Sequence, residues 1–345
     1  MINKGTILLA SLAMLCLEIS SNESFDYSSR DDVKEYIEEI SNKHGFESDK
    51  LLKLLGSAVY QEKVVRIMNR QPEGTMTWSR YREMMVSDSR ISAGEEFIKL
   101  YKEDLNKAED LYGVPAEIIA SIIGIETRYG RIMGNIRVLD SLMTLSFNYP
   151  RRSKFFKVQL EEFLLLSREE GFNPESLEGS IAGAMGYGQF MPDSYRKYAV
   201  DFDSDGVRDI LTNPVDAIGS VANFLSKKGK WKPNTPIAIQ ARNVSNQTTF
   251  ESRFKPYMTV IELRKIGLEP KEKIPGNLKF VPIFLELDST SNSNTPLRMS
   301  LTPFKSGSSE YWLGFDNYYS LSRYNRSKLY VMAVIEFSRS LSIYF

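Results

Sequence analysis

One stretch of the chain, residues 118–130, combines a strongly apolar helix pattern with a single acid, and this restricts how the chain can fold. Pro115 before the stretch is typical of a first helical turn, and Gly130 is typical of a helix end. At the 3.6-residue helical repeat, one stripe consists of Ile118, Ile122, Ile125 and Tyr129. Glu126 falls inside this stripe, so the sequence predicts a helix that carries a carboxylate on its buried face.

A buried carboxylate is costly unless it is paired or protonated. Desolvation raises the pKa of such a group, which suits a general acid that works near neutral pH. The alternative is a structural glutamate held by a neighbouring arginine such as Arg128 or Arg131. The stretch by itself favours neither interpretation of Glu126.

The composition excludes several kinds of chemistry. The 345 residues, enough for two or three domains, carry no net charge, and their dispersed basic residues argue against a nucleic-acid partner. The chain has one histidine, His44, which is predicted to end a surface helix, and one cysteine, Cys16. Zinc sites built from cysteine and histidine are therefore impossible within one chain, and no organic cofactor is expected. Catalysis must use carboxylates, lysine, tyrosine or hydroxyl groups.

The first 21 residues resemble an export signal. Lys4 precedes an apolar run over residues 7–17, which is short for a membrane span, and a polar segment follows. A short buried helix is the alternative. Cys16 is a candidate for lipid attachment, although Met14 and Leu15 before it fit poorly because small residues are expected there. Without Cys16 the mature chain has no cysteine, which is compatible with an oxidising compartment.

Most of the remaining pattern is helical. Helices are predicted at residues 31–40, 48–55, 78–86, 92–111, 155–171, 214–225 and 327–341. Between residues 231 and 309, proline, serine, threonine and asparagine become frequent, and short strands are predicted at 278–287 and 297–301, with an exposed loop at 289–295. The aromatic-rich segment after residue 311 suits either core packing or a sugar platform.

Two further segments are candidates for ligand contact. The glycine-rich segment 180–192 has neither dinucleotide nor phosphate-loop spacing, so its small residues are predicted to let the backbone approach a ligand or helix, with Gln189 at the rim. The basic cluster of Arg151, Arg152 and Lys154 is either a solvated helix start or a clamp for acidic groups.

An acidic loop after residue 200 predicts a metal site. Asp201, Asp203 and Asp205 match the first, third and fifth positions of a calcium loop. The later positions are occupied by Gly206 at the turn, Val207 with its carbonyl, Asp209 at position nine and Thr212 at position twelve. A glutamate is expected at position twelve, so Asp216 is the candidate that closes the site. An acidic turn without metal is the alternative.

These motifs together resemble the membrane-bound lytic transglycosylase B family of Gram-negative bacteria. The resemblance covers residues 31–340 and rests on Tyr112-Gly-Val-Pro, the stretch 122–131, Arg137-Val-Leu-Asp, Ala182-Gly-Ala-Met-Gly-Tyr-Gly-Gln-Phe-Met-Pro, Asp216-Ala-Ile-Gly-Ser-Val-Ala-Asn and Ser322-Arg-Tyr-Asn-Arg-Ser.

The resemblance implies a mainly α (α+β) fold, with a lysozyme-like helical core, a helical N-terminal domain and a small β-containing insertion. The corresponding segments are a signal peptide (1–21), a helical domain (22–105 with 326–345), the catalytic core with its EF-hand-like loop (106–231 with 311–325) and the insertion (232–310).

The resemblance also implies cleavage of the β-1,4 bond between N-acetylmuramic acid and N-acetylglucosamine, with a 1,6-anhydro product. The family's catalytic acid matches Glu126. Its glycan- and peptide-binding residues match Tyr81, Arg151, Arg152, Ser180, Gln189, Tyr324, Asn325 and Tyr330. Its calcium ligands match Asp201, Asp203, Asp205, Val207 and Asp216.

Most glycosidases need two carboxylates, and the spacing of acids in this chain offers no convincing second one. A lytic transglycosylase needs only one, because the C6 hydroxyl of the substrate attacks its own anomeric carbon. The alternatives are a muramidase-type hydrolase and a non-catalytic cell-wall binding protein. The expected protein is a periplasmic monomer that binds peptidoglycan strands, with cell-wall synthesis proteins as candidate partners and an outer-membrane lipid anchor as an option.

Overall fold

The computed structural model describes residues 25–69, 76–245, 250–251, 253–274, 277–288 and 309–345. Its helices are α1 (Asp31–His44), α2 (Ser48–Gly56), α3 (Glu62–Asn69), α4 (Trp78–Met85), α5 (Asp88–Tyr112), α6 (Ala116–Thr127), α7 (Val138–Asn148), α8 (Ser153–Glu170), α9 (Pro192–Tyr198), α10 (Pro214–Phe224), α11 (Val260–Lys265), α12 (Asp316–Ser322) and α13 (Lys328–Leu341). Its strands are β1 (Ile136–Arg137), β2 (Glu178–Gly179), β3 (Ala238–Asn243), β4 (Leu268–Pro270), β5 (Val281–Leu285) and β6 (Glu310–Gly314).

The helices predicted from apolar periodicity are confirmed, with ends that differ by a few residues. α1 begins at Asp31 with two acids in its first turn and ends at Gly45, which is left-handed (φ 69°). Among the helices that the pattern missed, α7 is buried over residues 138–146, so it lacks the polar face by which periodicity is recognised. The predicted signal peptide, Cys16, the strand at 297–301 and the loop at 289–295 lie outside the described residues.

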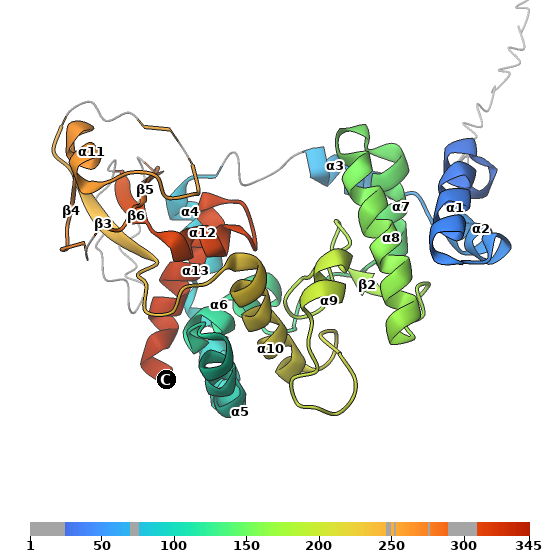
Figure 1. Ribbon diagram of the computed structural model, residues 1–345, viewed down its shortest axis with the longest axis horizontal. Helices are drawn as coiled ribbons and strands as arrows, with labels where there is room; N and C mark the ends of the chain where they lie inside the picture. The colour runs from blue at the N-terminus through green and yellow to red at the C-terminus, as the bar shows by residue number, and fades with distance from the viewer. Residues whose placement is uncertain (1–24, 70–75, 246–249, 252, 275–276, 289–308) are drawn as a thin grey trace, which may run out of the picture.

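The helices form two adjoining groups (Figure 1). In the first group, α5, α10 and α13 pack against α6, and α4 packs against α13. In the second group, α7, α8 and α9 pack in sequence, α3 lies against α7, and α1 packs with α2. Contacts between α9 and α10 join the two groups. Within the described part of the chain, no helix is both long and apolar enough to cross a membrane.

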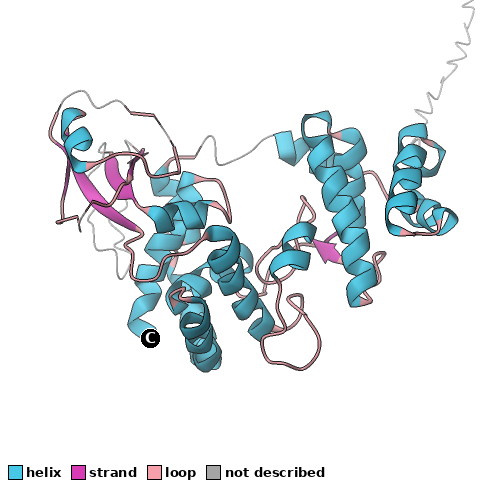
Figure 2. Cartoon of the chain, viewed as in Figure 1, coloured by secondary structure: helices cyan, strands magenta, loops and turns pink. Residues whose placement is uncertain are grey.

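A four-stranded antiparallel sheet with the order β4-β3-β6-β5 lies at the end of the molecule opposite α1 and α2 (Figures 1 and 2). Leu263, Leu268, Phe280 and Leu313 form part of a small core of its own. The sheet is tied to the first helix group, because the Trp78 N–H at the start of α4 donates to the Glu286 carbonyl (2.8 Å).

The observed elements divide the chain differently from two of the predicted boundaries. The boundary between residues 105 and 106 falls inside α5, which is kinked at Tyr101 but continues to Tyr112. The boundary between residues 310 and 311 falls inside β6, which pairs with both β3 and β5. Residues 311–314 therefore belong to the sheet rather than to the helical core.

Asp140 joins the N-terminal helices to α7. Its Oδ1 accepts from Arg137 Nη2 (2.6 Å) and from the Val59 backbone N–H (2.9 Å). Arg137 in turn donates to the Ser57 carbonyl (2.5 Å). The aspartate is 6% exposed, so this ion pair is shielded from water. The Arg137-Val-Leu-Asp motif thus has a structural role in holding the segment after α2 against α7.

Replacing Asp140 by alanine leaves the Arg137 guanidinium and the Val59 N–H without their partner. We expect the free energy of unfolding to fall by about 3 kcal/mol, because removing one member of a buried pair leaves an uncompensated charge. Urea unfolding followed by circular dichroism measures this change. Glu47→Ala is the matched control, since its pair with Lys50 is exposed and should contribute less than about 1 kcal/mol. Equal losses in the two variants would contradict the role of Asp140.

Candidate functional site

Glu126 lies in the last turn of α6, where the helix leaves the core. Ile118, Ile119, Ile122 and Ile123 of the same helix are at most 1% exposed, whereas Glu126 is half-buried. The Tyr330 hydroxyl of α13 donates to Glu126 Oε1 at 2.7 Å. The predicted arginine partner Arg131 instead pairs with Glu96 of α5 (3.1 Å). The carboxylate therefore sits at a helix end, with a buried phenol as its donor.

The chain leaves α6 abruptly, three residues before the predicted end at Gly130. Arg128 (φ 50°) and Tyr129 (φ 59°) are both left-handed, a conformation that costs energy for residues other than glycine. Thr127 supports this turn because its hydroxyl donates to the Tyr187 carbonyl (2.9 Å) and accepts from the Gly130 N–H (3.0 Å). A Cβ at Gly130 would lie 2.3 Å from the Tyr187 ring, so glycine is required there.

Tyr330 and Tyr324 form a stacked pair beside the carboxylate. Their rings are 6.4 Å apart with an interplanar angle of 8°. Burial raises the pKa of both hydroxyls well above the ordinary value, and the Glu126 charge raises it further. Both phenols therefore stay protonated near neutral pH, and Tyr330 stays a donor to Glu126.

The glycine-rich segment 180–192 is held against this pair. The Tyr324 hydroxyl donates to the Gly188 carbonyl (2.5 Å). A Cβ at Gly188 would lie 2.9 Å from the Tyr324 hydroxyl oxygen, so a larger residue would be crowded there. Gln189 has a left-handed backbone (φ 49°), and its amide donates to the Met133 carbonyl (3.1 Å) and the Gly186 carbonyl (3.0 Å). The backbone of this segment therefore approaches its neighbours closely, as predicted. The neighbours that the structure shows are helices and aromatic rings of the same chain.

The structure also describes three further residues that are predicted to bind glycan: Ser180, Tyr81 and Asn325. The Ser180 hydroxyl accepts from the Ala184 N–H (3.1 Å) and so shapes the glycine-rich turn. Tyr81 of α4 is 3% exposed and raises the pKa of Tyr330, so it lies within electrostatic reach of that hydroxyl. Asn325 is half-buried and directly follows Tyr324.

Arg151 and Arg152 belong to the other helix group. Both are exposed, in the single 3-10 turn η3 (Pro150–Arg152) between α7 and α8. The Arg152 guanidinium lies over the Phe155 ring (4.4 Å to its centre) and near the Phe156 ring (5.2 Å). Such a planar cation on an aromatic surface suits recognition of carboxylate groups. Its place in glycan binding stays a prediction.

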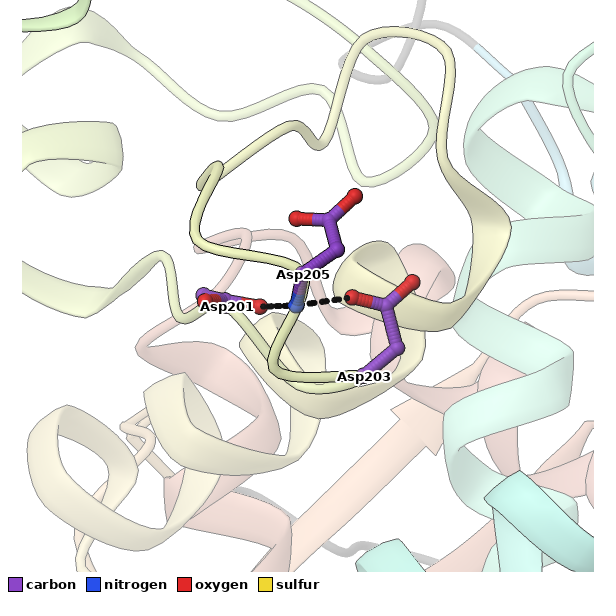
Figure 3. Close-up of side chains that lie close together, drawn as sticks. All are labelled: Asp201, Asp203 and Asp205. Atoms are coloured by element: carbon purple, nitrogen blue, oxygen red, sulfur yellow. Dashed lines mark hydrogen bonds between the residues drawn. The ribbon is translucent and has the colours of Figure 1, made fainter.

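The acidic loop between α9 and α10 brings three of its four carboxylates together. Oxygen atoms of Asp201, Asp203 and Asp205 lie within 4.8 Å of one another, and the Asp205 N–H donates to the other two carboxylates (Figure 3). The side-chain amide of Asn213 lowers the pKa of Asp203, which keeps this carboxyl ionised near neutral pH. Three anions this close favour a cation between them.

The predicted late ligand, Asp216, has another visible role. It is fully buried in the first turn of α10, and its two oxygens accept from the Phe202 and Asp209 N–H groups, each at 2.7 Å. Asp209, at position nine, accepts from the N–H groups of Leu211 and Thr212 instead of pointing to the three carboxylates. Asp216 thus anchors both ends of the acidic loop, and it lies outside the cluster that Asp201 begins. Its role and that of the Val207 carbonyl as ligands stay predictions.

Sequence reasoning missed one residue that contacts the end of α6. Arg90 of α5 is 8% exposed and donates from Nη1 to the Gly124 carbonyl (2.7 Å). Its position in the sequence could have indicated this contact. An arginine in the first turn of a helix is disfavoured by the helix dipole, so a partner on another element is expected.

Comparison with known proteins identifies relatives over most of the chain. The family model described as the transglycosylase SLT domain matches residues 28–339. The membrane-bound lytic murein transglycosylase B of Escherichia coli (strain K12) is 38% identical over 327 residues, which cover 92% of this chain and 84% of the relative.

Solved structures of lytic transglycosylases have the same fold. SltB1 of Pseudomonas aeruginosa has a TM-score of 0.81 at 38% identity, covering 92% of this chain and 99% of that one. Slt35 of Escherichia coli in complex with calcium has a TM-score of 0.79 at 38% identity, covering 92% and 95%. SltB3 of Pseudomonas aeruginosa in complex with NAG-NAM-pentapeptide has a TM-score of 0.71 at 25% identity, covering 90% and 79%.

These likenesses confirm the predicted fold class, a mainly α protein with a lysozyme-like helical core. The match extends through both helix groups and the sheet, so it is not limited to one motif. The chain therefore belongs to the transglycosylase SLT domain family.

Proposed function

We propose that this protein is a peptidoglycan lytic transglycosylase that uses Glu126 alone as acid and then as base. The bond cleaved is the β-1,4 link between N-acetylmuramic acid and N-acetylglucosamine. The observation that carries the proposal is the hydrogen bond from a buried, protonated Tyr330 to the Glu126 carboxylate at the end of an apolar helix. The relationship to lytic murein transglycosylase B of Escherichia coli supports the substrate class.

In the first step, protonated Glu126 gives its proton to the glycosidic oxygen, and the bond from that oxygen to the muramoyl anomeric carbon breaks. The muramoyl N-acetyl group covers the cationic centre. In the second step, the C6 hydroxyl oxygen bonds to the anomeric carbon, and the Glu126 carboxylate takes the hydroxyl proton. One bond breaks and one forms within the sugar, so the products are a new N-acetylglucosamine hydroxyl and a 1,6-anhydro ring. The acid is regenerated without water.

The tyrosine pair and the glycine-rich segment support this chemistry. Tyr330 donates to Oε1 of Glu126, which fixes the orientation of the carboxylate from which the proton is transferred. Tyr324 fixes the Gly188 backbone, so the segment containing Ser180 and Gln189 is held in place beside the acid. We assign these residues, with Tyr81, Asn325, Arg151 and Arg152, to binding of the glycan and its peptide.

Replacing Glu126 by glutamine removes the transferable proton while preserving shape. We expect a folded protein that releases no anhydromuropeptides from purified sacculi, because no other group supplies the acid. Glu117→Gln on the same helix is the matched control and should retain activity. Mass spectrometry of the products identifies the reaction. A product heavier by one water would assign a hydrolase instead, and sacculus binding by the wild type without soluble product would assign a binding protein.

Replacing Tyr330 by phenylalanine removes only the hydroxyl that donates to Glu126. Hydrogen bonds to charged groups contribute about 1.5–3 kcal/mol, so we expect kcat to fall roughly 10- to 100-fold. Tyr311→Phe is the control, since its hydroxyl bonds Asn243 (3.2 Å) in the sheet and its loss should not alter kcat. A Tyr330→Phe enzyme with wild-type kcat would show that Glu126 does not depend on this donor.

We also propose that the acidic loop binds a structural calcium ion through Asp201, Asp203 and Asp205, with Val207 and Asp216 as candidate further ligands. Calcium prefers oxygen ligands at about 2.4 Å, and one oxygen from each of the three carboxylates lies within 4.8 Å of the other two, close enough to share one ion. Gly206 (φ 92°) provides the sharp turn. A bound ion would offset much of the negative charge of the loop and fix the path from α9 to α10, and it would take no part in the proton transfers.

Calcium should raise the melting temperature, because an ion that binds only the folded state stabilises it. At 100 times the dissociation constant the gain is about 2.7 kcal/mol, or a shift of several degrees for a protein of this size. Scanning calorimetry with calcium, magnesium or chelator measures the shift. The Asp203→Asn/Asp205→Asn variant should lose most of it. No shift at millimolar calcium would leave the loop as an ordinary acidic turn.

We place the protein in the periplasm of a Gram-negative bacterium as a monomer, on peptidoglycan strands and near cell-wall synthesis proteins. The description of the Escherichia coli relative as membrane-bound supports an association with a membrane, for which Cys16 is the candidate site of lipid attachment.

A further inference from the structure

A buried arginine contacts the end of the helix that carries the proposed acid. Arg90 Nη1 donates to the Gly124 carbonyl (2.7 Å) and, at 3.4 Å, to the Ile125 carbonyl. These carbonyls belong to the two residues that directly precede Glu126. The Gly124 carbonyl also accepts from the Arg128 backbone N–H (3.1 Å), so Arg90 adds a second donor from α5 and ties the final turn of α6 to that helix. Any movement of that turn would move the Glu126 carboxylate.

The position of Arg90 is unfavourable by local criteria. It lies in the first turn of α5, where the helix dipole disfavours a cation, and it is 8% exposed. The ion pairs among the described residues do not include it, and its Nε has no hydrogen-bond partner there. A buried guanidinium without a carboxylate partner is costly. Because α5 gains no stability from a buried cation in its first turn, we expect the Arg90 guanidinium to interact favourably with another element.

The negative end of α6 provides that interaction. Helix C-termini carry partial negative charge, and Glu126 adds a full charge when it is ionised. Burial lowers the pKa of Arg90, and Arg128 lowers it further. The Glu126 charge acts in the opposite direction, so the carboxylate lies within electrostatic reach of the guanidinium.

We propose that Arg90 is a positioning residue, which fixes the last turn of α6 through the Gly124 and Ile125 carbonyls and places a positive charge at the end of the helix that carries Glu126. The inference rests on the proposed function, because the carboxylate is anionic only after it has protonated the leaving oxygen. A guanidinium is suited to this task since it stays charged and presents several donors in a fixed plane.

Other ionisable groups lie on the elements that pack around α6. Tyr330 and Tyr324 are protonated phenols, and Tyr81 of α4 is buried beside them. The charged groups on these elements include Arg128 at the end of α6 itself, Glu96 of α5 paired with Arg131, Glu336 of α13 paired with Arg82 and Arg339, and Asp216 of α10 bonded to two backbone N–H groups.

The decisive variant is Arg90→Gln, which removes the charge but keeps an amide donor near the α6 carbonyls. We expect kcat on sacculi to fall on the order of 100-fold, because small displacements of a catalytic group have effects of this size. Without the cation the protonated form of Glu126 is favoured. The high-pH limb of kcat/KM, along which the acid loses its proton, should therefore move to higher pH. A folded Arg90→Gln enzyme with wild-type kcat and pH profile would overturn the proposal.

Two further variants separate positioning from simple stabilisation. Arg131→Met removes an exposed arginine near the same helix end and should leave kcat and the pH limb unchanged. Arg90→Lys keeps the charge but not the planar donors, so kcat should fall while the pH limb stays near that of wild type. If the glutamine variant does not fold, Arg90→Lys decides: a lowered melting temperature with unchanged kcat would show a structural role only.

The same assay distinguishes failure of this inference from failure of the proposed function. If Glu126→Gln retains activity, the single-acid mechanism is wrong whatever the Arg90 variants do. If Glu126→Gln is inactive and the Arg90 variants behave as wild type, only the positioning role is wrong.

Discussion

The structure depends on presenting a carboxylate at the C-terminal end of an apolar helix. The helix dipole disfavours a negative charge at that place, and Glu126 is half-buried there. In the mechanism we propose, the same carboxyl acts first as an acid and then as a base. The Tyr330 hydroxyl and the Arg90 guanidinium reach this helix end from two other helices, and both donate hydrogen bonds there.

The surrounding fold explains why so many elements are needed for one acid. Tyr330 is separated from Glu126 by 204 residues, yet α13 packs directly against α6. Gly124 allows this approach, since a Cβ there would lie 2.7 Å from the Phe337 ring of α13 and 2.5 Å from the Tyr129 hydroxyl. The strained turn at Arg128 and Tyr129 then directs the chain toward the glycine-rich segment. Strain of this kind is kept where the surrounding packing determines it fully, as is common at functional sites.

The acidic loop acts at a distance from this chemistry. It connects α9 to α10, and α10 packs on α6, the helix that carries Glu126. Asp216 contributes to this connection without being part of the carboxylate cluster, because it is buried and bonds to the backbone at Phe202 and Asp209.

The sequence alone determined what depends on local pattern: the principal helices, the acid in the apolar stripe of α6, the acidic turn with Gly206, and the family. Short-range periodicity and spacing encode the helices, the acid and the turn, and the family is indicated by the resemblance of several motifs to known sequences, so all of these can be read without coordinates. Only the tertiary structure decided that the helix ends at Thr127 rather than Gly130, that β6 joins the sheet, and that Tyr330 and Arg90 meet the end of α6. These features arise from contacts between segments far apart in the chain, and such contacts are fixed by the packing of whole helices rather than by any local signal.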